Sequence, residues 1–258
     1  MPADFESLVA EGAAAPLKGW DFSWFEGRAT EERPPWGYAR RLAGRLGTAR
    51  AALDIQTGGG EVLAESPRRP PLLVATESFA PNVALAHRAL RPLGAWVVTA
   101  GDDAGLPFRT DSFDLVASRH PTVTVWAEIA RVLQPGGAYL SQQVGVGSVR
   151  ELTDFMMGPQ PVSDARSVSR AVTAATRAGL VVVDVREASL RTVFYDVAAV
   201  TPTCTMPLDR ARLHGRALSP AARRAPRVDP DRRLLRRARA AVPHRGPEAN
   251  PTGANMSG

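Results

Sequence analysis

A short apolar run that stops at three consecutive glycines constrains the fold of this chain more than any other segment. The run covers residues 51–55, the glycines are Gly58, Gly59 and Gly60, and residues 61–65 follow with a helical pattern. Glycine has no Cβ, so such a turn can adopt positive φ angles and bring backbone N–H groups close to a ligand. The pattern is typical of a nucleotide-binding turn, although a purely structural turn would look the same.

Further apolar, β-rich runs recur along the chain with helical segments between them. The predicted strands are residues 51–55, 72–75, 95–99, 113–117, 138–142 and 180–185, and the predicted helices are 81–90, 126–133 and 165–178. Continuous apolar runs such as Trp96-Val97-Val98 suit strands that helices cover on both faces. The alternation predicts an α/β fold, a doubly wound and mostly parallel sheet with helices on both faces.

Composition excludes several classes of protein. No apolar run reaches the roughly 18 residues that span a bilayer, and the first residues lack the pattern of a secretory signal, so a cytoplasmic protein without membrane contact is expected. Cys204 is the only cysteine, which excludes an intrachain disulfide. No group of histidine and acidic residues has the spacing of metal ligands, so no metal is predicted.

The chain divides into three parts by residue content. Residues 1–50 are rich in aromatic residues and are predicted to form a helical N-terminal extension that packs on the sheet or covers a ligand crevice. The residues that fit one face of its helix are Trp36, Ala39, Leu42, Ala43 and Leu46. Residues 51–200 are predicted to be a cofactor-binding domain. Residues 201–258 form a separate tail rich in Arg, Pro and Ala.

Acidic residues follow the predicted strands in a recognisable order. Glu77 ends the second strand, where a carboxylate can accept both hydroxyls of a ribose. The third strand leads into Gly101-Asp102-Asp103-Ala104-Gly105-Leu106-Pro107-Phe108, and Ser112-Phe113-Asp114-Leu115-Val116 comes next. The last of these segments is Glu128-Ile129-Ala130-Arg131-Val132-Leu133-Gln134-Pro135-Gly136-Gly137. Over residues 45–145 this order and spacing resemble class I S-adenosylmethionine-dependent methyltransferases of the type 11 kind.

The resemblance implies a Rossmann-like fold, S-adenosylmethionine as cofactor and a set of binding residues. Asp54 and Gly58 to Gly60 would form the loop at the methionine end of the cofactor, and Glu77 would bind the ribose hydroxyls. Asp102 would accept the adenine amino hydrogen beside the backbone of Asp103. Leu106 and Phe108 would pack near the adenine.

Gln56 departs from the family pattern, which has glycine at this position. Its side chain would either crowd the cofactor or add a hydrogen bond to it, so Gln56 is included among the cofactor-binding candidates. An inactive member of the family is therefore one hypothesis for this chain.

Arg119 and His120 are the candidate catalytic residues, because they follow the fourth strand at the edge where open α/β sheets bind ligands. His120 would act as a general base, since the ordinary histidine pKa is about 6.5. Arg119 would hold an anionic substrate or the cofactor carboxylate. Local hydrogen bonding in a loop is the alternative for both. Gln142 and Gln143, at the end of the fifth strand, are candidates to face the substrate.

The basic excess of the chain is confined to its tail. Residues 201–258 hold 12 arginines against 4 acidic residues, and the whole chain has a formal charge of +6. The run Arg232-Arg233-Leu234-Leu235-Arg236-Arg237 could contact nucleic acid phosphates, and a disordered segment is the alternative.

A third hypothesis is that the tail is a frameshifted reading of the usual C-terminus. Permitted codons for residues 208–218, read one nucleotide later, can encode Ser-Thr-Val-Pro-Gly-Phe-Thr-Val-Glu-Arg. The same shift over residues 242–251 can give Phe-Leu-Ile-Glu-Ala-Arg-Lys-Pro, which looks like a final strand. The resemblance implies a seventh, antiparallel strand between the fifth and sixth, so this strand is expected to be missing or altered here.

The best interpretation is a methyltransferase that transfers a methyl group from S-adenosylmethionine to an unidentified acceptor, most simply a small molecule. An NAD(P)-dependent oxidoreductase is the alternative among enzymes, but the chain lacks a full Gly-x-Gly-x-x-Gly. A non-catalytic nucleic-acid-binding protein that acts through the basic tail is the alternative from another class. The oligomeric state is left open.

Overall fold

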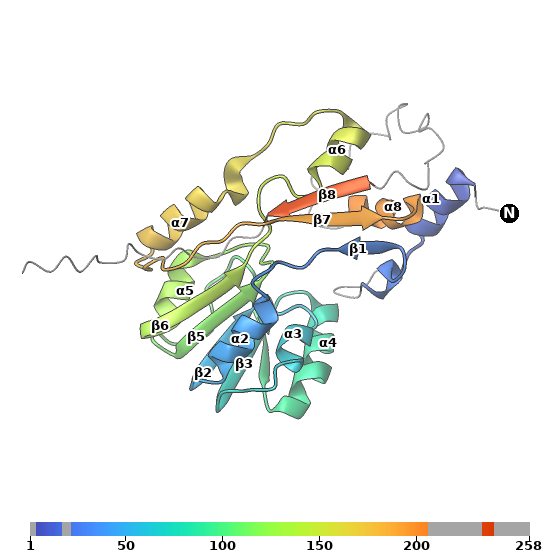
Figure 1. Cartoon of the computed structure of the whole chain (residues 1–258). Coiled ribbons are helices and arrows are strands. Elements are labelled where there is room, and N and C mark those ends of the chain that lie inside the picture. Colours follow the sequence, from blue (N-terminus) through green and yellow to red (C-terminus); the bar gives the residue numbers. More distant parts are fainter. Residues whose placement is uncertain (1–3, 17–21, 206–233, 240–258) are drawn as a thin grey trace, which may run out of the picture.

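The computed structural model describes residues 4–16, 22–205 and 234–239. Its main sheet has five parallel strands in the order β4-β3-β2-β5-β6 (Figure 1). These strands are β2 (Ala51–Ile55), β3 (Leu72–Glu77), β4 (Trp96–Thr99), β5 (Phe113–Arg119) and β6 (Leu133–Gln142). The chain runs outward from β2 to β4 and then crosses to β5 on the other side. The carboxyl ends of β2 and β5 are therefore the topological switch point, where open α/β sheets bind ligands.

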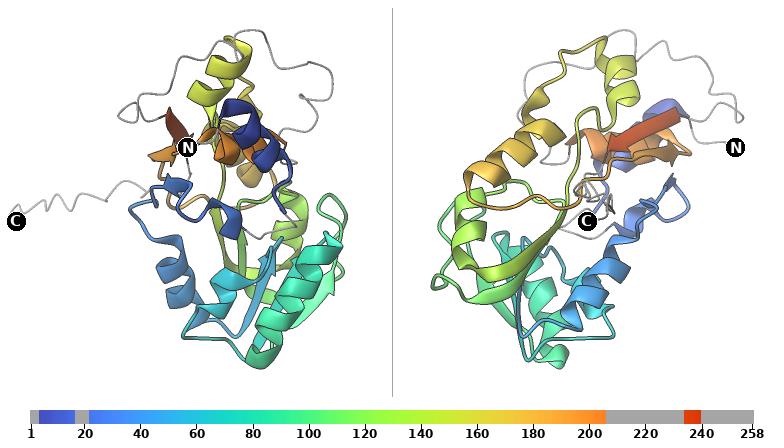
Figure 2. Two further views of the ribbon diagram at one scale, coloured as in Figure 1. Left: turned by 90° about the vertical axis from the view of Figure 1, so that its right-hand side faces the viewer. Right: turned by 60° about the vertical axis from the view of Figure 1, so that its left-hand side comes forward.

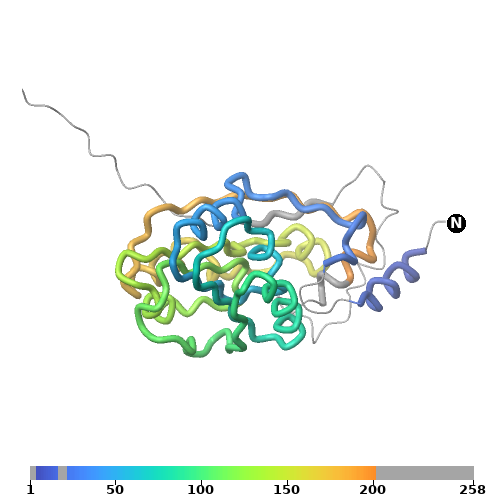
Figure 3. Tube along the Cα trace, turned by 90° about the horizontal axis from the view of Figure 1, so that it is seen from below, coloured from blue at the N-terminus to red at the C-terminus, as the bar shows by residue number. Residues whose placement is uncertain are grey.

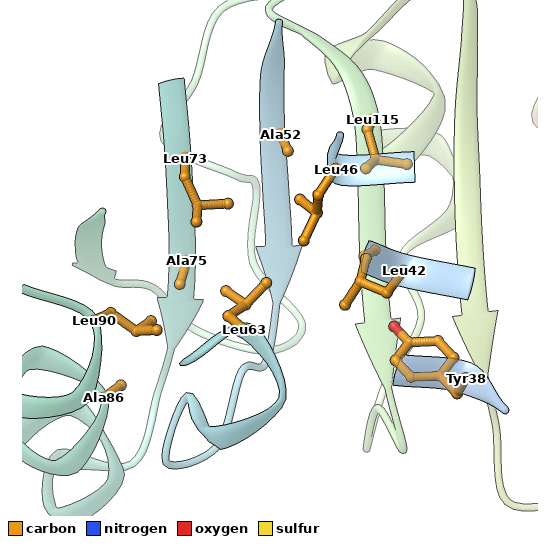
Figure 4. Close-up of a cluster of buried hydrophobic side chains, with 11 residues drawn as sticks. Tyr38, Leu42, Leu46, Ala52, Leu63, Leu73, Ala75, Ala86, Leu90 and Leu115 are labelled. Atoms are coloured by element: carbon orange, nitrogen blue, oxygen red, sulfur yellow. The ribbon is translucent and has the colours of Figure 1, made fainter. Parts of the chain in front are cut away.

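Helices cover both faces of the sheet, as the strand–helix alternation predicts. The helices on one face are α2 (Tyr38–Leu46), α3 (Glu61–Ala64) and α4 (Ala80–Leu90), and α5 (Trp126–Val132) lies on the other. Successive strand residues point to opposite faces, so Ala52 packs with α2 while Leu53 packs with α5. Figure 4 shows the first of these clusters, with Leu42, Leu46 and Leu63 lying over the strands. The doubly wound α/β fold is confirmed.

A smaller antiparallel sheet, in the order β1-β7-β8, lies apart from the main sheet (Figures 1 and 2). Its strands are β1 (Ala29–Glu31), β7 (Ser189–Phe194) and β8 (Leu234–Arg239). The helices of this layer are α1 (Phe5–Ala13), α6 (Arg150–Met157) and α8 (Val197–Thr205). The remaining helical segments are η1 (Ser23–Phe25), η2 (Arg91–Leu93), η3 (Asp164–Arg166) and α7 (Val168–Arg177).

Gly12 allows α1 to lie directly against α8. A Cβ added to Gly12 would lie only 2.8 Å from the Cβ of Thr201, which is closer than real side chains approach. Arg28 reinforces this junction because its guanidinium pairs with both Glu11 and Asp196. The N-terminal helix is thereby joined to the chain that follows β7, at one end of the molecule in Figure 3.

The prediction of a strand at residues 180–185 is wrong for this structure. The segment is not a strand, and β7 begins at Ser189 in the smaller sheet. Val181 is 85% exposed and Val183 is 62% exposed. A strand requires a hydrogen-bonding partner, and in the described part of the chain β6 is an edge strand paired only with β5. The local pattern favours a strand, but none of the described strands pairs with residues 180–185.

Helix predictions agree with the structure more closely. The predicted helices at 81–90 and 126–133 are α4 and α5, and the predicted helix at 165–178 overlaps η3 and contains α7. On α2 the buried residues are Tyr38, Leu42 and Leu46, whereas Ala39 of the predicted face is exposed. Trp36 is buried just before the helix begins.

The hypotheses about the tail concern residues that mostly lie outside the described ones. Of residues 201–258, the structure describes only 201–205 and 234–239. Within the described ranges, no helix is both long enough and apolar enough to cross a membrane.

Candidate functional site

The glycine turn connects β2 to α3 at the switch point of the sheet. Gln56, Gly58 and Gly60 have positive φ angles of 57°, 64° and 80°. A Cβ on Gly60 would lie 2.9 Å from Leu90, so this glycine also lets the turn pack against α4. The turn is thus structural in part, yet it leaves the backbone of Gly58 and Gly59 at the carboxyl end of β2.

Glu77 ties this turn to the end of β3. The residue is 6% exposed, and its Oε2 accepts a hydrogen bond of 2.8 Å from the N–H of Gly58. Its Oε1 accepts from the N–H groups of Ser78 and Phe79 at 2.9 and 3.0 Å. An ionised carboxylate has about four acceptor positions, so these three donors orient Glu77 and leave capacity for a further donor.

A first cavity lies beside the turn and encloses about 410 Å³ of space that is open to solvent. Gln56, Asp102 and Leu106 line it, together with Ser118 and Tyr139 from β5 and β6. Asp102 Oδ2 accepts a hydrogen bond of 2.8 Å from the hydroxyl of Thr122. Its Oδ1 is buried and accepts no hydrogen bond, so the carboxylate keeps an unused acceptor.

An ion pair on α5 holds the loop that carries Leu106. Arg131 donates to Glu128 Oε1 at 2.7 Å, and Leu106 N–H donates to Glu128 Oε2 at 2.6 Å. Arg131 also donates to the carbonyls of Leu106 and Phe108 at 2.9 and 2.7 Å. The hydrogen bond from Arg131 lowers the pKa of Glu128. The i,i+3 spacing of these two charges was the signal for this clamp, which the sequence interpretation missed.

Gln56 spans the crevice and joins β2 to the loop after β5. Its amide nitrogen donates to the carbonyl of Val123 at 2.7 Å. Its Oε1 accepts from the N–H of Thr122 at 2.6 Å and lies 3.0 Å from the Thr122 hydroxyl. We call this set of contacts the Gln56 strap. The left-handed conformation is unfavourable for a residue with a Cβ, so the surrounding contacts hold it there.

A second cavity lies on the other side of Gln56, and its space of about 280 Å³ is likewise open to solvent. Tyr38, Asp54, Glu61 and Arg119 line it, and Arg119 lies 4.0 Å from Glu61. Burial raises the pKa of Asp54 to about 7, with the charges of Glu61 and Glu77 adding to the rise and that of Arg119 opposing it. The hydroxyl of Tyr38 is buried without a hydrogen-bond partner, and burial raises its pKa well above the usual value.

Burial of Asp54 predicts that the free energy of unfolding falls as the pH rises toward neutrality. The carboxyl titrates near about pH 3.9 when unfolded and near about 7 when folded. Between these values only the folded state binds the proton, so its contribution is full below about pH 4 and is lost as the pH rises through about 7. The loss is at most about 4 kcal/mol. Asp54→Asn should remove it, which urea unfolding of both proteins at about pH 5 and about pH 8 would reveal. Identical pH dependence in the two proteins would contradict the assignment.

The side chains of the two candidate catalytic residues lie in different places, although the residues are neighbours in sequence. Arg119 ends β5 and points toward the second cavity, beside Asp54 and Glu61. His120 has a φ of 54°, and its ring lies 2.9 Å from the side-chain amide of Gln142. Gln142 is 3% exposed, so its side chain faces His120 and the interior.

The structure brings five of the eleven predicted site residues into the walls of the two cavities. Those that line the two cavities are Asp54, Gln56, Asp102, Leu106 and Arg119. The other predicted residues line neither cavity, and Asp103 is exposed. They are Gly58, Gly59, Gly60, Glu77, Asp103 and His120. Among the residues that the structure describes, no group of three or more His, Cys, Asp or Glu side chains could hold a metal ion.

Comparison with known proteins finds a family match for the part of the chain that forms the main sheet. Residues 53–141 match the type 11 family of methyltransferase domains. No curated protein sequence matches the chain. The fold is similar to that of YcgJ from Bacillus subtilis, with 18% identity, a TM-score of 0.55 and coverage of 81% of this chain and 99% of that one.

Two further solved structures share the fold at low identity. A functionally unknown protein from Deinococcus radiodurans has 14% identity and a TM-score of 0.56, over 83% of this chain and 90% of its own. A candidate methyltransferase from Bacillus halodurans has 16% identity and a TM-score of 0.55, over 79% and 94%. The match over residues 53–141 and the Rossmann-like α/β fold identify this part of the chain as a methyltransferase domain of the type 11 kind.

Proposed function

We propose that the crevice at the switch point binds S-adenosylmethionine across both cavities and presents its methyl group to a small-molecule acceptor. Asp102 and Leu106 would hold the adenine, with the backbone of Asp103 beside them, and Glu77 would hold the ribose hydroxyls. Asp54 and the backbone of Gly58 to Gly60 would hold the methionine end.

The observation that carries this proposal is the buried Oδ1 of Asp102. Buried polar atoms without a partner are uncommon, and this one belongs to a residue that lines the first cavity, so a bound ligand would be its natural donor. An exocyclic amine of adenine supplies such a donor. The second cavity offers a matching feature in Asp54, whose carboxylate would be stabilised by the ammonium of an amino acid.

The cofactor supplies a methyl group on a positively charged sulfur, so the protein has little covalent chemistry to perform. The residues of the chain bind and orient the reactants and exclude water, which in favourable cases supplies about 7–11 kcal/mol of the barrier reduction. Arg119, which lines the second cavity, would hold an anionic group of the acceptor or of the cofactor. His120 would contribute from the adjacent loop.

Titration calorimetry with S-adenosylmethionine tests the proposal. The folded protein should bind the cofactor, and Asp102→Ala should weaken binding about 10- to 100-fold through the loss of a charge-assisted hydrogen bond. Glu187→Ala removes an exposed carboxylate that lines neither cavity, and it serves as the control that should leave binding unchanged. Absence of binding to folded protein would refute the proposal, and binding of NAD instead would favour an oxidoreductase.

A further inference from the structure

His120 is held between the end of β5 and the end of β6 by two contacts to the same residue. Its backbone N–H donates a hydrogen bond of 2.6 Å to the carbonyl of Gln142. Its ring Nε2 lies 2.9 Å from Nε2 of the Gln142 side chain. The register of the sheet sets up this pairing, because Arg119, the preceding residue, is the partner of Gln142 in the ladder.

The chemistry of the Gln142 amide decides whether the ring nitrogen of His120 donates or accepts this hydrogen bond. An amide nitrogen of glutamine only donates hydrogen bonds, so a ring nitrogen 2.9 Å away accepts one with its lone pair. In a neutral imidazole the proton is then on the other nitrogen, Nδ1. The other atom of the amide, Oε1 of Gln142, is buried and accepts no hydrogen bond. The amide nitrogen is therefore the atom through which this nearly buried side chain acts on the ring.

We infer that Gln142 is a positioning residue that fixes the tautomer of His120, with the ring proton on Nδ1. The consequence for catalysis rests on the proposed function, in which His120 contributes to methyl transfer. Since Nε2 accepts a hydrogen bond from Gln142 and Nδ1 carries the proton, neither ring nitrogen is left to act as a general base. This favours an acceptor whose nucleophilic atom is already unprotonated, such as a carboxylate. Its lone pair forms the bond to the methyl carbon as the carbon–sulfur bond breaks, and no proton has to leave.

Nitrogen-15 NMR of histidine-labelled protein reads the tautomer directly and needs neither cofactor nor acceptor. The chain has four histidines, His87, His120, His214 and His244, and the signals of His120 are identified by their loss in His120→Asn. At about pH 8, above the ordinary histidine pKa of about 6.5, the wild type should show the Nδ1–H pattern for His120. An Nε2–H pattern would mean that the amide is reversed, and it would overturn the inference.

Gln142→Glu provides the discriminating variant. A carboxylate only accepts hydrogen bonds, so His120 should change to a form protonated at Nε2. Gln134→Glu makes the same chemical change at the beginning of β6 and should leave the His120 pattern as in the wild type. An unchanged pattern in a folded Gln142→Glu protein would also overturn the inference. If that variant does not fold, the wild-type spectrum alone decides. Because no cofactor is present, failure here is distinct from failure to bind S-adenosylmethionine.

Discussion

Replacing Gln56 with glycine is expected to tighten the binding of S-adenosylmethionine about 10- to 100-fold. Gln56 is the wall that the two cavities share, and its side chain is bonded across the crevice to Thr122 and Val123. A ligand that occupies both cavities has to break this strap. Each hydrogen bond of the Gln56 strap is worth about 0.5–1.5 kcal/mol net. The cost of opening the strap therefore lowers the apparent affinity of the wild type for the cofactor by about 10- to 100-fold.

Two variants separate the strap from the strain of the backbone. Gln56→Ala and Gln56→Gly both remove the side-chain contacts, so both should bind the cofactor more tightly in calorimetric titrations. Only glycine also relieves the left-handed conformation at a φ of 57°, which should offset part of the stability that is lost with the strap. The glycine variant should therefore melt at a higher temperature than the alanine variant. Weaker cofactor binding by both would instead show that Gln56 donates to the cofactor.

The sequence anticipates the parts of this site that depend on local pattern. The glycine turn follows from an apolar run that meets three glycines, and Glu77 follows from its place at the end of the next strand. In the structure the two are joined by the hydrogen bond from Gly58 to Glu77. Five predicted strands occur in the main sheet. The apolar runs of the inner strands β2, β3 and β5 are mostly buried, as expected for strands covered on both faces. The same expectation is wrong for the edge strand β4, where Trp96 is 68% exposed.

The features that escape prediction depend on contacts between distant segments. Gln56 and Thr122 are 66 residues apart, and only the folded loop after β5 brings them together. The pairing of His120 with Gln142 likewise requires the register of β5 against β6. The strand prediction at residues 180–185 is wrong although the local pattern is clear. Their pattern favours a strand, but strand formation depends on a partner that local sequence does not reveal.

The outer edge of β6, which is unpaired among the described strands, and the partly exposed segment at 180–185 lead to a second prediction, which concerns the thermal stability of the chain. A chain whose C-terminal part is read one nucleotide later is expected to melt about 10 °C higher than the present one. The segment Phe-Leu-Ile-Glu-Ala-Arg-Lys-Pro of that frame looks like a final strand and would pair with β6, which is an edge strand in the described part of the chain. Cross-strand pairs contribute about 0.2–1 kcal/mol each, so six residues with two neighbours supply about 3–5 kcal/mol.

The coding DNA is the first measurement, because the hypothesis requires both predicted segments in one alternative frame. Thermal unfolding then compares the present chain, the alternative-frame chain and an alternative-frame chain with Gly-Ser-Gly in place of Phe-Leu-Ile. Only the second should gain stability, because the third lacks the apolar residues of the added strand. Equal melting temperatures for the second and third would show that the gain comes from losing the arginine-rich tail.

A cooperative, reversible melt of ordinary stability for the present chain would show that its sheet needs no further strand. Cofactor binding is measured separately, since Asp102, Glu77 and the glycine turn all lie in the part of the chain that both frames share.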